Sequence, residues 1–128
     1  MKTYKKILVI DDYKGILDAL EVIISDMGHT VFLSKNVSQA KKIIANEPID
    51  LILCDLVMMK ETALDFLKWN NENNKIPTLV MTGLFDIALR PKIKKLGAIG
   101  LLIKPFDVHE LEAQISAIFN NRADKIAA

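Results

Sequence analysis

The sequence of 128 residues is poor in several residue types that mark whole classes of protein. Its single cysteine, Cys54, excludes an intrachain disulfide, which is typical of a reducing compartment. Aromatic residues make up only 6% of a chain that is 51% hydrophobic, so the core must be largely aliphatic. No apolar run approaches the length of a membrane-spanning helix, and the run after Lys5 and Lys6 is too short for a signal peptide. We therefore expect a cytoplasmic domain that does not contact a membrane.

The chain has no excess of charge of either sign. Its 17 lysines and arginines oppose 16 aspartates and glutamates, and the net charge of +1 argues against direct nucleic-acid binding. The two histidines, His29 and His109, lack the spacing of metal ligands. Neither a P-loop nor a glycine-rich turn follows the first apolar run, which argues against a nucleotide-binding protein. The chemistry must therefore come from carboxylates, hydroxyl groups and lysines.

Short aliphatic runs alternate with segments of helical period along the chain. The runs expected to form strands are Ile7–Ile10, Val31–Leu33, Leu51–Cys54, Thr78–Met81 and Leu101–Ile103. This alternation is typical of βα units, and it predicts an α/β fold with a parallel sheet. We expect one domain over residues 1–121 and a frayed tail over residues 122–128, where the apolar period is lost.

Capping residues predict where the helices between these runs begin. Ser38, Thr62 and Asp107 each precede a segment of helical period, and all three are good N-cap residues. The helix after Asp12 should end at a glycine, Gly28. Pro91 breaks a helix interior but suits a first turn, so the fourth helix should be short or kinked.

Four of the apolar runs end in a side chain that can handle a phosphoryl group. The first run stops at Asp11 and Asp12, the third at Asp55, the fourth at Thr82 and the fifth at Lys104. The carboxyl ends of parallel strands meet at one edge of a sheet, and ligands bind there in open α/β folds. The sequence therefore predicts that these side chains converge on one site.

Three carboxylates brought together repel one another, which raises at least one pKa unless a cation lies among them. Oxygen ligands without a nearby histidine or cysteine suit Mg²⁺. With a metal held by Asp11 and Asp12, Asp55 is free to act as a nucleophile toward a phosphoryl group. The Lys104 ammonium and the Thr82 hydroxyl should then pair with the phosphoryl oxygens that the metal does not reach.

The order of these motifs resembles the receiver domain of two-component response regulators over nearly the whole chain. The matching segments are Ile7 to Asp12, Asp55-Leu56-Val57-Met58, Thr82-Gly83, Gly97-Ala98 and Lys104-Pro105-Phe106. The resemblance implies a flavodoxin-like (βα)5 three-layer sandwich with strand order 2-1-3-4-5. It implies phosphoryl transfer to Asp55 from a sensor histidine kinase or a histidine phosphotransfer protein, with Mg²⁺ as cofactor.

The same resemblance implies roles for individual residues. It implies that Asp11, Asp12, Asp55 and the backbone carbonyl of Val57 bind the metal, and that the bond between Lys104 and Pro105 is cis. It also implies a domain that catalyses only its own phosphorylation and dephosphorylation. An output partner should then read the face from Gly83 to Phe119, and the domain should be a monomer or a weak dimer.

Several positions depart from the usual sequence of this family. Met59 and Ala63 stand where the loop after the phosphoacceptor usually has proline and glycine, so this loop should be shaped differently. Leu101 occupies the position of the aromatic switch residue. Val57 and Leu84 stand at the positions that flank the path of the hydrolytic water, and neither side chain can orient water. We expect a phosphoryl group on Asp55 to decay slowly for that reason.

Other interpretations remain open at this point. Asp12 could simply cap a helix, Thr82 could serve a turn, and Lys104 could be an ordinary surface lysine. The alternative function is a receiver-like interaction module that binds its partner without phosphorylation. A Mg²⁺-dependent phosphohydrolase is disfavoured, because the position two residues after Asp55 holds Val57 and not a general acid. The sequence does not identify the kinase, the output partner or the regulated process.

Overall fold

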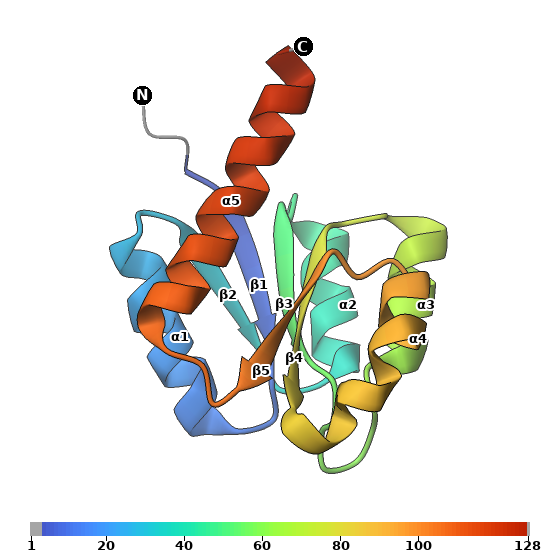
Figure 1. Cartoon of the computed structure of the whole chain (residues 1–128). Helices are drawn as coiled ribbons and strands as arrows, with labels where there is room; N and C mark the ends of the chain where they lie inside the picture. The colour runs from blue at the N-terminus through green and yellow to red at the C-terminus, as the bar shows by residue number, and fades with distance from the viewer. Residues whose placement is uncertain (1–3, 128) are drawn as a thin grey trace.

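Five parallel strands form one sheet in the order β2-β1-β3-β4-β5 (Figure 1). The computed structural model describes residues 4–127, and the side chains of residues 84, 85, 87 and 121–127 lie outside the described part. The strands are β1 (Lys6–Ile10), β2 (Thr30–Ser34), β3 (Leu51–Asp55), β4 (Thr78–Gly83) and β5 (Gly100–Lys104). The predicted parallel sheet and its strand order are confirmed.

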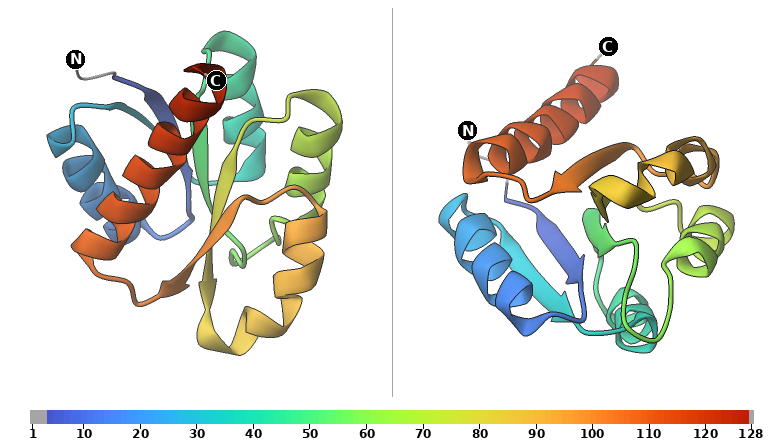
Figure 2. Two further views of the ribbon diagram at one scale, coloured as in Figure 1. Left: turned by 45° about the horizontal axis from the view of Figure 1, so that its top comes forward. Right: turned by 60° about the horizontal axis from the view of Figure 1, so that its bottom comes forward.

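Helices cover both faces of this sheet and make the three layers of the sandwich (Figures 1 and 2). On one face lie α1 (Lys14–Asp26) and α5 (Val108–Ala127). On the other face lie α2 (Val37–Asn46), α3 (Leu64–Asn73) and α4 (Arg90–Lys95). A 3-10 segment, η1 (Leu84–Leu89), joins β4 to α4. No helix in the described part of the chain is both long and apolar enough to cross a bilayer.

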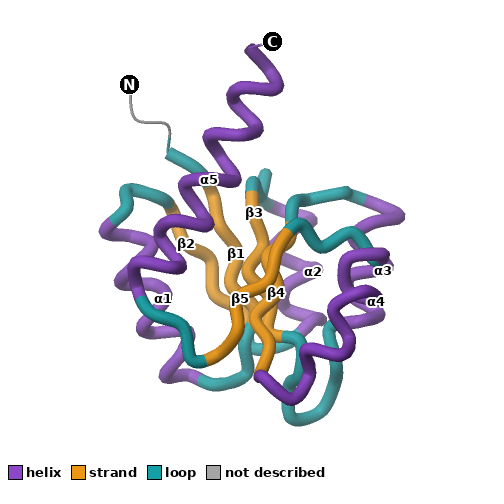
Figure 3. Tube along the Cα trace, in the orientation of Figure 1, coloured by secondary structure: helices purple, strands orange, loops and turns teal. Residues whose placement is uncertain are grey.

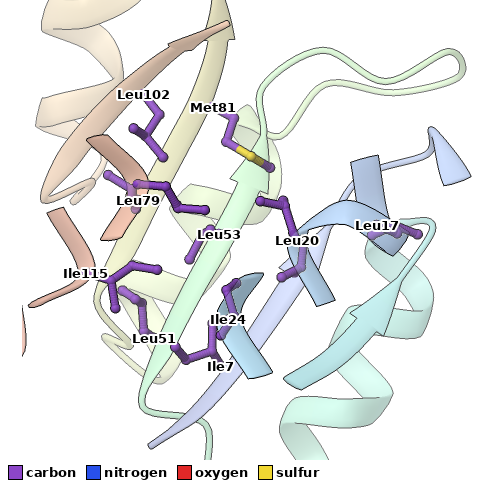
Figure 4. Close-up of a cluster of buried hydrophobic side chains, with 12 residues drawn as sticks. Ile7, Leu17, Leu20, Ile24, Leu51, Leu53, Leu79, Met81, Leu102 and Ile115 are labelled. Carbon is purple, nitrogen blue, oxygen red and sulfur yellow. The ribbon is translucent and has the colours of Figure 1, made fainter. Parts of the chain in front are cut away.

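β1 is apolar over Ile7–Ile10 and β3 over Leu51–Cys54, because helices cover these strands on both sides. Alternate side chains of β1 and β3 point to opposite faces. Ile7 and Leu53 pack toward α1 and α5 in the cluster drawn in Figure 4, whereas Leu8 and Cys54 pack toward α2 and α3. Cys54 is fully buried, and burial raises the pKa of its thiol. Cys54 is therefore a core residue.

The helix boundaries confirm some of the predicted caps and correct others. Asp107 caps α5, since its Oδ1 accepts a hydrogen bond from the Glu110 amide at 2.7 Å. Pro91 lies in the first turn of α4, which has only six residues. Thr62 is not a cap, because it pairs with Val57 in a short antiparallel bridge and α3 begins only after Ala63.

The cap predicted for α2 was also wrong. The residue that caps this helix is Asn36, whose extended backbone (φ −158°) places its side-chain oxygen 2.8 Å from the Gln39 amide. Ser38 lies inside the first turn as a result. Toward the end of the chain, the backbone of α5 is helical to Ala127. The frayed tail that we expect over residues 122–128 stays a prediction. Helix-forming alanine, arginine and lysine continue the segment there.

The corrected cap of α2 gives a paired test of local stability. Replacing Asn36→Ala removes the acceptor for an otherwise unpaired helix amide, so the free energy of unfolding should fall by about 1 kcal/mol. Ser38→Ala should change it by less than about 0.5 kcal/mol. Urea unfolding of the two variants measures both effects. A larger loss of unfolding free energy in Ser38→Ala than in Asn36→Ala would contradict the cap at Asn36 and support Ser38 as the cap, as the sequence predicted.

Candidate functional site

The polar residues singled out in the sequence come together at the carboxyl edge of the sheet. This edge lies at the bottom of Figures 1 and 3, where the strands run into their following loops. Asp11 and Asp12 directly follow β1, Asp55 is the last residue of β3, and Lys104 is the last residue of β5. The strand register aligns Ile10 with Cys54, so the acidic residues that follow lie next to each other across β1 and β3.

Three carboxylates form the centre of this site. Asp11, Asp12 and Asp55 each place one oxygen within 4.8 Å of the oxygens of the other two. Asp11 is fully buried, Asp55 is 7% exposed, and Asp12 is partly exposed. Asp12 is therefore the most exposed of the three carboxylates.

Lys104 supplies the positive charge that balances this cluster. Its Nζ lies 2.9 Å from Asp11 Oδ2 and 3.3 Å from Asp55 Oδ1. Burial lowers the pKa of Lys104, but the hydrogen bond and ion pairs with the two carboxylates outweigh burial and leave the pKa raised. The peptide bond between Lys104 and Pro105 is cis, as predicted. Lys104 is therefore not an ordinary surface lysine.

Backbone amides fix the orientation of the first two carboxylates. The Tyr13 amide donates to Asp11 Oδ1 at 2.9 Å, so both oxygens of Asp11 have partners. Asp12 Oδ2 accepts a hydrogen bond from the Met59 amide, in the loop after β3. Tyr13 is the N-cap residue of α1 and makes no side-chain cap. The alternative in which Asp12 caps this helix is therefore wrong, because the carboxylate of Asp12 is directed to the opposite loop.

Asp55 is the carboxylate whose pKa departs most clearly from the usual range. Burial and the neighbouring charge of Asp11 raise the pKa of Asp55 to about 6, against the opposing effect of Lys104. The charge of Asp12 raises it further. A group that is ionised at neutral pH only against this cost gains strongly from a nearby cation.

The structure describes three of the four remaining predicted positions. Thr82 is buried at the end of β4, and its hydroxyl donates to the Gly83 carbonyl at 3.3 Å, so its pairing with a phosphoryl oxygen stays a prediction. Leu101 is partly buried and packs against an apolar cluster between the sheet and α4. The side chain of Val57 is 49% exposed. The side chain of Leu84 lies outside the described residues.

The loop after β3 contains contacts that reasoning from the sequence missed. This loop, residues 56–63, is closed by the bridge between Val57 and Thr62, and the Glu61 carboxylate accepts a hydrogen bond from the Val37 amide at 2.8 Å. The same loop contacts Asp12 through the backbone amide of Met59. Almost every residue type has a backbone N–H, so a donor of this kind cannot be recognised from the sequence. The one available signal was that Met59 is not a proline, which has no N–H.

The donor set of this site fits a hard divalent cation. Carboxylate oxygens from three residues face one another, and neither a histidine nor a thiol is among them. In the loop after β3, the backbone hydrogen bonds on either side of Val57 are made by the Leu56 carbonyl and the Met58 amide. The Val57 carbonyl accepts none of the backbone hydrogen bonds described within this loop. Oxygen-only ligands of this kind suit Mg²⁺. Asp11, Asp12 and Asp55 are the residues that would hold such an ion.

Comparison with known proteins gives consistent results in sequence and in structure. A family model described as a response regulator receiver domain matches residues 7–116. A probable transcriptional regulator, ycf27, of Guillardia theta is 30% identical over 127 residues, which are 99% of this chain and 50% of that protein. The transcriptional regulatory protein ZraR of Klebsiella oxytoca is 32% identical over 111 residues, which are 86% of this chain and 25% of that protein. The chain thus spans half or less of the length of these two curated relatives.

Solved structures show the same likeness. Full-length FixJ from B. japonicum superposes with a TM-score of 0.83 at 28% identity, and the match covers 93% of this chain and 59% of that one. A CheY-like response regulator receiver domain protein from Methanospirillum hungatei superposes with a TM-score of 0.87 over 96% of this chain and 99% of that one. Its 21% identity supports the fold alone.

The crowding of carboxylates predicts a stabilising substitution. In the folded protein the pKa of Asp55 is about 6, above the value of about 3.9 in an unfolded chain, so ionised Asp55 costs stability above pH 6. With EDTA present, Asp55→Asn should raise the free energy of unfolding by about 1–2 kcal/mol at pH 8. The gain should fade as the pH falls through 6 toward 4, where wild-type Asp55 becomes protonated.

Urea unfolding at several pH values measures this dependence. Asp26→Asn is the matched control, because Asp26 is exposed at the end of α1 and far along the chain from the cluster. Equal effects of the two substitutions, or a gain that grows toward acid pH, would contradict the repulsion described for Asp55.

Proposed function

Because the chain belongs to the response regulator receiver domain family, we propose that it accepts a phosphoryl group on Asp55 from a phosphohistidine donor, in a reaction that depends on Mg²⁺. The donor is a sensor histidine kinase or a histidine phosphotransfer protein. The observation that supports this most strongly is the position of Asp55 beside two further carboxylates and one lysine ammonium. Such a group gains more from a nearby cation than an isolated aspartate does.

In the proposed transfer, an oxygen of Asp55 attacks the phosphorus of the donor phosphohistidine. The new O–P bond forms as the N–P bond breaks, and the imidazole nitrogen of the donor leaves with the bonding electrons and takes a proton. Mg²⁺, when bound, neutralises charge on the phosphoryl oxygens. Lys104 exchanges its contact with Asp55 for a phosphoryl oxygen and keeps its 2.9 Å contact with Asp11. The Thr82 hydroxyl at the end of β4 rotates from the Gly83 carbonyl to another phosphoryl oxygen.

The same residues limit the chemistry to the protein's own aspartate. Hydrolysis of free phosphomonoesters requires a general acid for the leaving group. The side chain two residues after Asp55 is that of Val57, half exposed at the rim of the site, and it cannot donate a proton. We therefore propose a self-modifying switch and not an enzyme for other substrates.

The proposed consequence is a change in affinity for an output partner on the face from Gly83 to Phe119. A groove of about 170 Å³ lies on this face between α4 and β5. Its lining residues are Arg90, Ile93, Lys94, Ala98, Ile99, Gly100 and Leu101. Leu101 lines the groove and also packs against the apolar cluster between the sheet and α4. A structural shift near Thr82 can therefore reach this surface through packed side chains. The transcriptional regulators among the relatives favour an output in transcription.

One alternative function has sequence features in its favour. Met59, Ala63, Leu101 and Pro91 all depart from the usual pattern of the family, which suits an interaction module that binds its partner without phosphorylation. The two functions differ in one measurable respect. Only the proposed receiver forms an acyl phosphate on Asp55.

Phosphorylation by a small donor tests the proposal directly. Incubation with acetyl phosphate or phosphoramidate and Mg²⁺ should add one phosphoryl group to each chain, detected by intact-mass measurement. EDTA should prevent the adduct, because the transfer requires the metal. Asp55→Asn should give none, while the control Asp26→Asn should react like wild type. An unmodified wild-type protein under these conditions would instead support the interaction module.

The lifetime of the phosphoryl group gives a second test. Val57→Asn and Leu84→Gln each introduce an amide that can orient water, so either change should speed loss of phosphate by roughly tenfold. Val57→Ala is the control, since it removes apolar surface without adding a polar group. Decay is followed by intact mass after removal of the donor. Decay in the amide variants no faster than in wild type would contradict the explanation for slow hydrolysis.

A further inference from the structure

The backbone amide of Met59, in the loop after β3, contacts the candidate metal site. It donates a hydrogen bond to Oδ2 of Asp12, across 47 positions in the sequence. Receiver domains usually have proline at this position, and proline has no N–H to donate. The contact is therefore available to this chain because of one of its departures from the family.

The loop that carries this amide is held in place at several points. The Ala63 amide donates to the Leu56 carbonyl at 2.9 Å, and the Met58 amide donates to the Glu61 carbonyl at 2.9 Å. Met58 is buried, with 5% of its surface exposed. The Glu61 carboxylate also binds the Val37 amide at the start of α2. The Met59 amide is thus a fixed donor and does not depend on a flexible side chain.

The side chain of Met59 makes no comparable contribution. It is 93% exposed, whereas the amide of the same residue is bonded to a carboxylate of the site. Backbone and side chain can therefore be tested separately. A substitution that keeps the N–H should preserve the effect, and a substitution that removes it should not.

The hydrogen bond to Met59 is compatible with metal binding by Asp12. With this bond in place, an oxygen of Asp12 still lies within 4.8 Å of oxygens from Asp11 and Asp55. A hydrogen bond to an ionised carboxylate is among the stronger ones in proteins. Donors of this kind orient the carboxylates that bind a metal, and losing one typically costs 10- to 100-fold in metal affinity.

We propose that the Met59 amide is a positioning group that orients Asp12 for a divalent cation. The inference rests on the proposed function, because it assumes that Asp11, Asp12 and Asp55 bind Mg²⁺. It adds the Met59 amide, which is not one of the four metal ligands implied by the family resemblance, although one of those ligands, the Val57 carbonyl, belongs to the same loop. The loop and the metal site are then coupled, and binding of the cation also restrains residues 56–63.

Two variants of one residue test the proposal. Met59→Pro removes the N–H, and Met59→Ala keeps the N–H but removes the exposed side chain. Titration with Mg²⁺ in a calorimeter should show affinity at least about tenfold weaker in Met59→Pro and within about twofold of wild type in Met59→Ala. Unfolding in EDTA checks that both variants are folded. Equal Mg²⁺ affinities in the two variants would overturn the proposal and leave the proposed function intact.

Amide hydrogen exchange in wild-type protein provides a test that needs no substitution. In EDTA, the Met59 amide should exchange more slowly than that of Lys60, which donates no hydrogen bond to the described residues. Its NMR signal should move during Mg²⁺ titration with the affinity measured by calorimetry. Exchange as fast as that of Lys60 would overturn the proposal even if Met59→Pro does not fold. Absence of Mg²⁺ binding in wild type would overturn both the proposal and the proposed function.

Discussion

The ion pair of Lys104 with Asp11 and Asp55 is the interaction on which the rest of the site depends. Two carboxylates that are almost completely buried cannot both stay ionised without a cation, and the Lys104 ammonium lies 2.9 Å and 3.3 Å from their oxygens. One lysine does not neutralise three acids, and burial together with the charge of Asp11 raises the pKa of Asp55. The same imbalance favours a divalent cation, and the proposed phosphoryl transfer requires that cation. The free-energy cost of crowding the acids in the metal-free protein is therefore related to its proposed chemistry.

The fold produces this crowding through the topology of the sheet. β1 and β3 are adjacent and parallel, so the acids that follow or end them reach the same edge. β5 lies beyond β4, and the length of the Lys104 side chain allows it to span that distance and reach both acids. Aliphatic residues around these strands exclude water from one side of the cluster. A stable core therefore holds a destabilising group at its edge, which is common at functional sites.

The sequence was sufficient to predict the features that depend on strand periodicity and strand ends. The five strands, their α/β alternation and the convergence of Asp11, Asp12, Asp55 and Lys104 all follow from where apolar runs stop. Features set by backbone geometry were not predictable in this way. Asn36 replaces Ser38 as a cap because the chain turns into α2 two residues earlier. The contact between Met59 and Asp12 joins distant segments through an N–H that almost every residue type carries. The role of Leu101 likewise depends on packing beneath α4 and not on its own identity.

A carbon-13 NMR titration of the Asp55 carboxyl group tests most directly whether the buried acids repel one another and whether a cation relieves that repulsion. In metal-free protein, we expect the pKa of Asp55 to lie near 6, above the value of about 3.9 for an ordinary aspartate. Saturating Mg²⁺ should lower that pKa, because the cation favours the ionised form. A pKa near 4 without metal, or one that Mg²⁺ leaves unchanged, would contradict this explanation of the site.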